Sequence, residues 1–472
     1  MRSLLGPGTI LDGFHLDEHL CTGGMAQLWT VSRAEDRTPL VMKVPLLRDS
    51  DDPIPIVSFE VERMILPRLT GPHVPRFVGA GDFDVQPYLV MERIGGSSLK
   101  ASLDEVPLPW RDVVEIGVKV AKALHDLHRQ HVIHLDVKPS NIMFRETGEA
   151  VLIDYGFAHH EHLPDLLAEE FREPFGTTPY MAPEQVLQDR SDPRSDLFAL
   201  GVMLYFLVTG QRPFGTPRGN QIRQRLWRDP VPPRAVNPDC PPWLQEIILH
   251  CLEVDPRDRY ATAALLALDM EHPDQVRLTA RARRVGRGSG LQLLRRWMKA
   301  RRAKALPPST VSGQLQQAPI VMAAVDLSPG NDELAEALRR LVKRVISLEP
   351  GARIACVNVL KLSRLAVDIL EDAQGRSLHV QRLVQLKNWG ESLDLPPHRI
   401  TFSILEAADP ASALVDYARH NHVDHVVIGA RASSSLRRYL GSVSSQVVAE
   451  APCSVTVVRT PRDVHLPSVD QP

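Results

Sequence analysis

Four polar residues between positions 136 and 154 have the types and spacing needed to move a phosphoryl group. They are Asp136, Lys138, Asn141 and Asp154. Such a transfer needs a carboxylate that orients the acceptor hydroxyl, a cation on the γ-phosphate and oxygen ligands for Mg²⁺. Asp136 can orient the hydroxyl and Lys138 can reach the γ-phosphate. Because Asn141 and Asp154 offer oxygen atoms to the metal ion, the spacing predicts phosphoryl transfer from Mg-ATP.

A glycine-containing loop precedes this group. Glycine lets the backbone approach phosphate oxygens closely, with its N–H groups directed at them. Only the middle glycine of a Gly-x-Gly-x-x-Gly pattern is present, at Gly23, since Cys21 and Ala26 occupy the outer positions. Taken alone, the loop would be no more than a turn between strands. The residues expected to cover the phosphates are Cys21, Thr22, Gly23, Gly24, Met25, Ala26 and Leu28.

Together these motifs resemble those of the eukaryotic-like serine/threonine protein kinases, over residues 11–275. The resemblance implies a bilobal α+β fold, ATP and Mg²⁺ as cofactors, and protein substrates phosphorylated on Ser or Thr. A lysine inside an apolar run needs a partner for its charge, and Lys43 interrupts such a run. The resemblance places Lys43 on the α- and β-phosphates and pairs it with Glu62. Glu60 is the alternative partner, in a poorer register.

Further motifs of the same family supply a hinge and several structural contacts. The resemblance assigns the hinge beside the adenine pocket to Met91, Glu92 and Ile94. It also implies a buried ion pair between Glu184 and Arg259. Asp196 is expected to anchor the catalytic loop, because it matches an aspartate that does so in the family.

Three positions depart from the family pattern or bear on its regulation. Leu135 replaces the arginine that usually clamps a phosphorylated activation loop, so we expect activity to depend little on such phosphorylation. Tyr155 replaces a phenylalanine and adds a hydroxyl that needs a partner if it is buried. Thr177 and Thr178 are candidate autophosphorylation sites, although we expect the Thr177 hydroxyl to bond Asp136 instead.

Composition limits the remaining functions. The chain has 472 residues, which predicts two or three domains, and 55 basic residues against 57 acidic ones give no argument for a nucleic-acid partner. The five scattered cysteines lack C-x-x-C spacing, which predicts no disulfide framework and suits a reducing cytoplasm. The longest apolar stretch, 197–208, is too short to span a bilayer. We therefore expect a cytoplasmic protein without a transmembrane segment.

Two alternatives to a protein kinase remain from the sequence. The first is a weakly active or inactive pseudokinase scaffold that binds nucleotide and partners. The intact set of Asp136, Asn141 and Asp154 argues against this alternative. The second is phosphorylation of small molecules, which the intact segment 176–184 disfavours, because that segment normally shapes a peptide site.

Residues 276–316 form a basic junction. From 281 to 304 there are many Arg and Lys residues and no acidic ones, and apolar residues recur at helical spacing between 293 and 298. One interpretation is an amphipathic helix that binds an anionic membrane or an acidic partner. The other, which we favour, is a solvated linker with one helical turn packed on a lobe of the kinase.

Residues 317–461 alternate between short apolar runs and helical stretches. The expected strands lie at 320–326, 354–359, 400–405, 426–428 and 454–458. This alternation predicts an α/β doubly wound parallel sheet. The segment resembles the universal stress protein family, whose nucleotide-binding members imply a site at Asp326, Gly429, Gly441 and Ser442. Since Ala432 replaces one glycine of that pattern, a second nucleotide site and a homodimerisation module both remain open.

Overall fold

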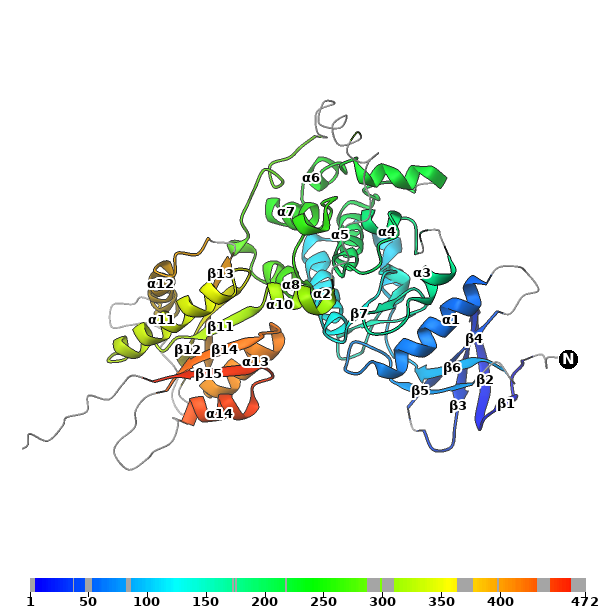
Figure 1. Ribbon diagram of the computed structural model, residues 1–472, viewed down its shortest axis with the longest axis horizontal. Coiled ribbons are helices and arrows are strands. Elements are labelled where there is room, and N and C mark those ends of the chain that lie inside the picture. Colours follow the sequence, from blue (N-terminus) through cyan, green and yellow to red (C-terminus); the bar gives the residue numbers. More distant parts are fainter. Residues whose placement is uncertain are drawn as a thin grey trace, which may run out of the picture. The chain divides into compact units, whose positions relative to one another are not determined.

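The computed structural model describes residues 5–36, 38–46, 53–81, 86–171, 174, 176–216, 219–286, 298, 310–362, 377–396, 399–430 and 442–459 (Figure 1). The chain divides into two compact units. The first comprises residues 1–273 and 278–315, and the second comprises residues 274–277 and 316–472. Most of the expected linker therefore belongs to the first unit.

The first unit begins with an antiparallel sheet in the strand order β1-β2-β3-β4-β6-β5. The strands are β1 (Ile10–Leu11), β2 (Phe14–Thr22), β3 (Ala26–Ser32), β4 (Leu40–Pro45), β5 (Phe77–Gly81) and β6 (Tyr88–Glu92), and helix α1 (Ile54–Ile65) lies between β4 and β5 in the chain. Apolar side chains at every second position, such as Leu40 and Met42, enter one buried cluster with Phe14 and Trp29. The sheet therefore has a packed face, as its period of two requires.

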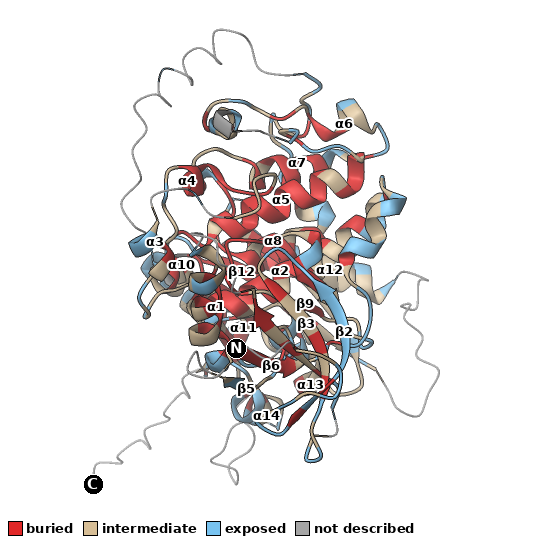
Figure 2. Ribbon diagram, turned by 90° about the vertical axis from the view of Figure 1, so that its right-hand side faces the viewer, coloured by how far each residue is buried: buried red, intermediate tan, exposed pale blue. Residues whose placement is uncertain are grey.

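A helical lobe follows the sheet, and most of its buried residues lie on central helices (Figure 2). The helices are α2 (Trp110–Arg129), α3 (Leu166–Glu170), α4 (Pro183–Val186), α5 (Arg194–Thr209), α6 (Pro233–Val236), α7 (Pro242–Cys251) and α8 (Ala263–Glu271). Helix α5 is buried along nearly its whole length, which explains its apolar stretch without a membrane. Short strand pairs join β7 (Val132–Ile133) to β10 (His159–His160) and β8 (Ile142–Phe144) to β9 (Ala150–Leu152). No helix within the described ranges has the length and apolarity to cross a bilayer.

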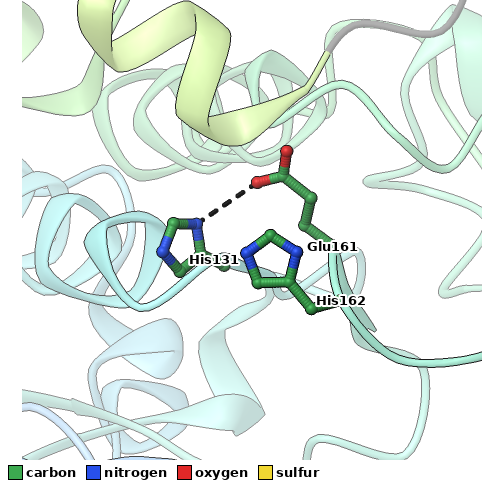
Figure 3. A group of neighbouring side chains, drawn as sticks. All are labelled: His131, Glu161 and His162. Carbon is green, nitrogen blue, oxygen red and sulfur yellow. Dashed lines mark hydrogen bonds and ion pairs between the residues drawn. The ribbon is translucent and has the colours of Figure 1, made fainter.

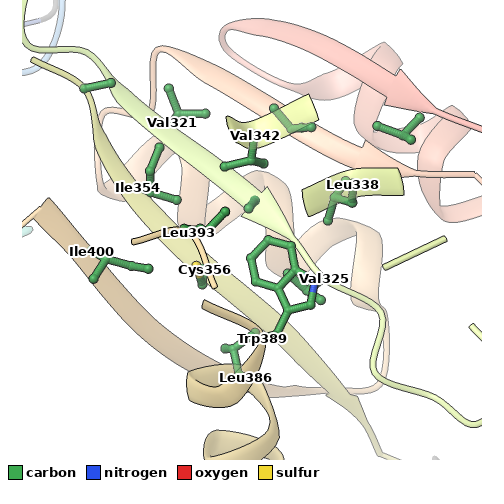
Figure 4. Close-up of a cluster of buried hydrophobic side chains, with 14 residues drawn as sticks. Val321, Val325, Leu338, Val342, Ile354, Cys356, Leu386, Trp389, Leu393 and Ile400 are labelled. Carbon is green, nitrogen blue, oxygen red and sulfur yellow. The ribbon is translucent and has the colours of Figure 1, made fainter. Parts of the chain in front are cut away.

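The second unit is built on a parallel sheet in the order β13-β12-β11-β14-β15. Its elements are β11 (Ile320–Ala324), α11 (Asp332–Leu348), β12 (Arg353–Lys361), α12 (Leu378–Glu391), β13 (Ile400–Ala407), α13 (Pro410–His420), β14 (His425–Gly429), α14 (Ser442–Glu450) and β15 (Ser454–Val458). Trp389 and Leu338 pack with β-branched residues of the strands in one core (Figure 4). The bilobal kinase fold and the doubly wound second domain are both confirmed.

Within residues 276–316, the described stretches 278–286 and 310–315 group with the first unit. Glu246 of α7 accepts hydrogen bonds from the backbone N–H groups of Thr279 and Ala282, both at 2.9 Å. Further along, α10 (Val311–Gln317) packs on the catalytic lobe, where Gln314 donates a hydrogen bond to the carbonyl of Ala261. The interpretation as an amphipathic helix rests on positions 293–298, which lie outside the described residues apart from position 298.

Candidate active site

One buried carboxylate anchors the catalytic loop through hydrogen bonds to its backbone. Asp196, at the start of α5, is fully buried and accepts the backbone N–H groups of His134 at 2.9 Å and Leu135 at 2.8 Å. His128 of α2 lies 2.9 Å from the same carboxylate. Leu135 has φ of +59°, a strained conformation for a leucine. The expected anchor is therefore present, and it holds the loop in a shape that the chain alone would disfavour.

The catalytic loop brings Asp136, Lys138 and Asn141 together. Lys138 Nζ lies 2.6 Å from Asp136 Oδ2 and 2.9 Å from Thr177 Oγ1. Asn141 Nδ2 donates to Asp136 Oδ2 at 3.1 Å. Asp136 Oδ1 accepts the backbone N–H of Thr177 at 2.7 Å. The threonine hydroxyl contacts Lys138 and not Asp136, contrary to expectation. The carboxylate is thus oriented from three sides.

Lys43 of β4 bridges two carboxylates from distant parts of the chain. Its Nζ lies 2.5 Å from Glu62 Oε2 on α1 and 2.7 Å from Asp154 Oδ1. Burial alone would lower the pKa of Lys43, but the charges of Asp154 and Glu62 outweigh burial and raise it, so the lysine stays cationic. Burial alone would raise the pKa of Asp154, but Lys43 holds it below its usual range. Glu60, the alternative partner, pairs instead with Arg63 at 3.5 Å.

The turn after Asp154 is fitted closely to α1. Asp154 has φ of +67°, and the next backbone N–H, of Tyr155, donates to Glu62 Oε1 at 3.2 Å. A Cβ atom at Gly156 would lie 2.0 Å from Ser58 Oγ, so a larger residue here would force the Ser58 side chain to move. The buried Tyr155 hydroxyl donates to the carbonyl of Leu152 at 2.9 Å, which supplies the partner it needs.

A cavity of about 630 Å³ opens between the sheet and the catalytic loop. That volume lies within the usual range for small-molecule sites. Most of the residues predicted to bind ATP line it: Cys21, Gly23, Gly24, Met25, Ala26, Leu28, Lys43, Glu62, Met91, Glu92, Ile94, Asn141 and Asp154. Lys138 also lines it, whereas Thr22, at the end of β2, is not among its lining residues.

Apolar residues of this cavity were missed by the sequence analysis. Val41, Met143 and Ile153 lie along its walls. Val41 stands two positions before Lys43 on β4, so period-two spacing could have found it.

The hinge is tied to the helical lobe by an ion pair. The Glu92 carboxylate lies 2.5 Å from Arg145 Nη1, and the hydrogen bond from Arg145 lowers the pKa of Glu92. Met91, the residue before it, is buried. This ion pair therefore ties the hinge, which lines the cavity, to the helical lobe.

The end of the activation segment carries the expected buried ion pair. Arg259 contacts both carboxylate oxygens of Glu184, at 2.6 and 2.7 Å, and Ser195 donates to the same carboxylate at 2.6 Å. Both ion-pair side chains are almost fully buried. This pair fastens the segment that follows the catalytic residues.

The Leu135 side chain packs among buried apolar residues. It packs in a cluster with Ile133, Val311 and Leu315, and Val311 is only 1% exposed. The last two residues belong to α10. A leucine beside the catalytic aspartate therefore gives α10 an apolar surface to dock on, where an arginine would leave a buried charge.

In the C-terminal domain, two predicted site residues follow neighbouring strands. Asp326 lies just after β11 and accepts the N–H of Ser328 at 3.0 Å, and Gly429 ends β14, which pairs with β11. The strand order reverses between these two strands, where ligands of such sheets bind. Ser442 begins α14 and is exposed, whereas Gly441 lies outside the described residues. A Cβ atom at Gly429 would lie 2.9 Å from Leu334, so this glycine also lets α11 pack closely.

Comparisons with known proteins agree with this arrangement. The protein kinase domain family matches residues 14–270, and the universal stress protein family matches residues 319–459. The probable serine/threonine-protein kinase CPE1738 of Clostridium perfringens is 34% identical over 215 residues, which cover 45% of this chain and 31% of that protein. The serine/threonine-protein kinase PknB of Mycobacterium leprae is 29% identical over 270 residues, covering 56% and 43%. The chain thus matches less than half the length of either relative.

Among solved structures, the kinase domain of Mycobacterium tuberculosis PknI matches 57% of this chain and 99% of its own, with 23% identity and a TM-score of 0.45.

Proposed function

This chain belongs to the protein kinase family and carries a universal stress protein domain after its kinase domain, and we propose that it is a serine/threonine protein kinase. It would transfer the γ-phosphate of ATP to hydroxyl groups of protein substrates. One observation carries the proposal: Lys138, which contacts Asp136, lines the same cavity as Lys43 and its partners Glu62 and Asp154.

The residues of the cavity fit Mg-ATP by their chemistry. Lys43 offers a cation to the α- and β-phosphates, and Glu62 holds that cation in position. Asn141 and Asp154 offer oxygen ligands of the kind that Mg²⁺ prefers. When bound, the metal ion would neutralise charge that develops on the phosphate oxygens.

Acceptor activation falls to the residues of the catalytic loop. Asp136 is held by Lys138, Asn141 and the Thr177 backbone, so its carboxylate can accept a hydrogen bond from an incoming Ser or Thr hydroxyl. Lys138 reaches both Asp136 and the cavity, and can therefore contact the phosphate that is transferred. Positioning and charge, rather than covalent chemistry, would supply the rate enhancement.

Labelled γ-phosphate transfer tests the proposal directly. The full chain is incubated with Mg-ATP, alone and with a generic protein substrate, beside Asp154→Asn and the exposed control Asp239→Asn. We expect phosphoserine or phosphothreonine in the wild type and the control, and none with Asp154→Asn. Nucleotide binding without transfer in every sample would overturn the proposal in favour of a pseudokinase scaffold.

For the C-terminal domain we propose a second nucleotide site at the switch point between β11 and β14. Its support is the placement of Asp326 and Gly429 at the carboxyl ends of neighbouring parallel strands. Equilibrium dialysis of the full chain should give two ATP molecules per chain, and one with Asp326→Ala. A single ATP in the wild type, together with concentration-dependent dimers, would favour a dimerisation module.

A further inference from the structure

A histidine-rich corner of the helical lobe lies beside the catalytic loop and has no part in the proposed phosphoryl transfer. It is formed where β7 and β10 pair, with His160 opposite Val132. The residue before β7, His131, and the residue after β10, Glu161, therefore meet at one end of this ladder. The Glu161 N–H donates to the His131 carbonyl at 2.9 Å. Residues thirty positions apart are thus held together by the backbone.

Three side chains converge at this corner: His131, Glu161 and His162 (Figure 3). Each offers one ligand atom, and all three atoms lie within 4.8 Å of one another. His131 Nδ1 is 3.2 Å from Glu161 Oε2. Ligands about 2.0–2.2 Å from a tetrahedral zinc ion are roughly 3.3–3.5 Å apart, so this pair already has suitable spacing. His162 is exposed and free to complete the set by rotating its side chain.

We propose that His131, Glu161 and His162 bind a transition-metal ion of the zinc class. Two imidazole nitrogens and one carboxylate oxygen suit Zn²⁺ and similar ions, whereas Ca²⁺ and Mg²⁺ prefer all-oxygen sites. Three protein ligands leave a coordination position for water. The site is separate from the Mg²⁺ ligands assigned to phosphoryl transfer.

The linker helix α10 competes for the same atoms. Ser312 Oγ lies 2.7 Å from Glu161 Oε2 and 3.0 Å from His131 Nδ1. The Ser312 N–H also donates to Glu161 Oε2, at 3.2 Å. A metal ion on these two ligand atoms displaces the serine from them. Metal binding and the docking of α10 therefore oppose each other, and each must weaken the other by the same factor.

This competition reaches the active site through one residue. Val311, the neighbour of Ser312, packs in the apolar cluster with Ile133 and Leu135, and Leu135 precedes the catalytic Asp136. The metal ion would thus loosen a segment that covers the catalytic loop and that leads directly into β11 of the second domain.

Titration of ZnCl₂ into the full chain, followed with a competing zinc chelator, tests the site. We expect His162→Ala to weaken zinc binding at least about tenfold, and the exposed control His15→Ala to leave it unchanged. Ser312→Ala should tighten binding several-fold, because it removes the competitor. Equal zinc affinity in the wild type and His162→Ala would overturn the site. Unchanged or weaker binding in Ser312→Ala would overturn the competition.

Two further measurements need no comparison of affinities. Co²⁺ bound to the wild type should show the visible absorption of a tetrahedral site, and His162→Ala should lose it. Amide hydrogen exchange at residues 311–315 should rise when Zn²⁺ is added. Slower exchange there would contradict the competition. None of these readouts depends on phosphoryl transfer, so their failure leaves the kinase proposal unaffected.

Discussion

Replacing a buried glutamate by glutamine should lower stability at Glu184 and turnover at Glu62. Their side chains are 1% and 4% exposed, and each contacts one basic side chain. The substitution removes the charge and keeps the size and most of the hydrogen bonding. The two sites differ in whether the basic side chain keeps a second carboxylate after the substitution. We therefore expect one variant to lose mainly stability and the other mainly turnover.

Glu184→Gln should mainly lower stability. The Arg259 side chain is fully buried, and its other hydrogen-bond partners are the carbonyl oxygens of Glu253, Arg194 and Val254, which carry no net charge. Breaking a buried pair in this way costs about 3–5 kcal/mol. That loss corresponds to roughly a 100- to 5000-fold shift in the unfolding equilibrium.

Glu62→Gln should mainly lower turnover. Lys43 keeps Asp154 at 2.7 Å, so its charge stays compensated and the free energy of unfolding should fall by no more than about 1.5 kcal/mol. The lysine is no longer held in place for the phosphates, however. Losing one preorganised electrostatic group typically lowers kcat about 10²–10³-fold.

Urea unfolding followed by tryptophan fluorescence gives the stability of each variant, and labelled phosphate transfer at saturating ATP gives kcat. Each glutamine variant serves as the control for the other. The reasoning is refuted if Glu62→Gln is destabilised as much as Glu184→Gln, or if it keeps kcat within about threefold of the wild type.

Three further predictions follow from single contacts. Leu135 replaces the arginine that would clamp a phosphorylated activation loop, and it packs against α10 instead. Phosphatase treatment should therefore leave most of the kinase activity, and near-complete loss would contradict this. Iodoacetamide at pH 8 should modify the exposed Cys21, and ATP should protect it, whereas burial raises the pKa of Cys251 to about 12 and should keep it unmodified in peptide mass spectra. Burial would raise the pKa of Asp165, but His159 and Arg190 outweigh burial and hold it well below its usual range. This carboxylate therefore stabilises the fold fully above its unfolded pKa of about 3.9. The stabilisation is lost as the pH falls through the lower folded pKa. Asp165→Asn should cost about 1.5–3 kcal/mol at pH 7 in urea unfolding, and a difference that failed to shrink towards about pH 2 would count against the pairing.

The stress protein domain was predictable because its signals are local. Each strand is a short apolar run, and the predicted strands match β11 to β15 within a few residues. What the sequence failed to predict in this domain was also a local feature. Asn331 is a residue type that favours helix N-caps and it occupies the N-cap of α11, but its side chain makes no capping hydrogen bond there. Residue type predicts which end of a helix a position occupies better than it predicts side-chain geometry.

For the kinase domain, the sequence by itself predicted the chemistry, because Asp136, Lys138 and Asp154 are the groups that phosphoryl transfer needs and stand at close spacing. It also predicted that Lys43 needs a partner, because a charge in an apolar strand is costly when unpaired. Only the tertiary structure decided contacts between distant residues. The Thr177 backbone, and not its hydroxyl, contacts the catalytic carboxylate.

The same holds for the linker and the histidine-rich corner. That Ser312 meets Glu161 and His131, and that Leu135 supports α10, depends on how packed elements bring separate segments together. Local patterns report the preferences of single segments, such as a period of two or 3.6 residues. Which segments then share a surface is set by packing over the whole domain, and no short stretch of sequence contains that information.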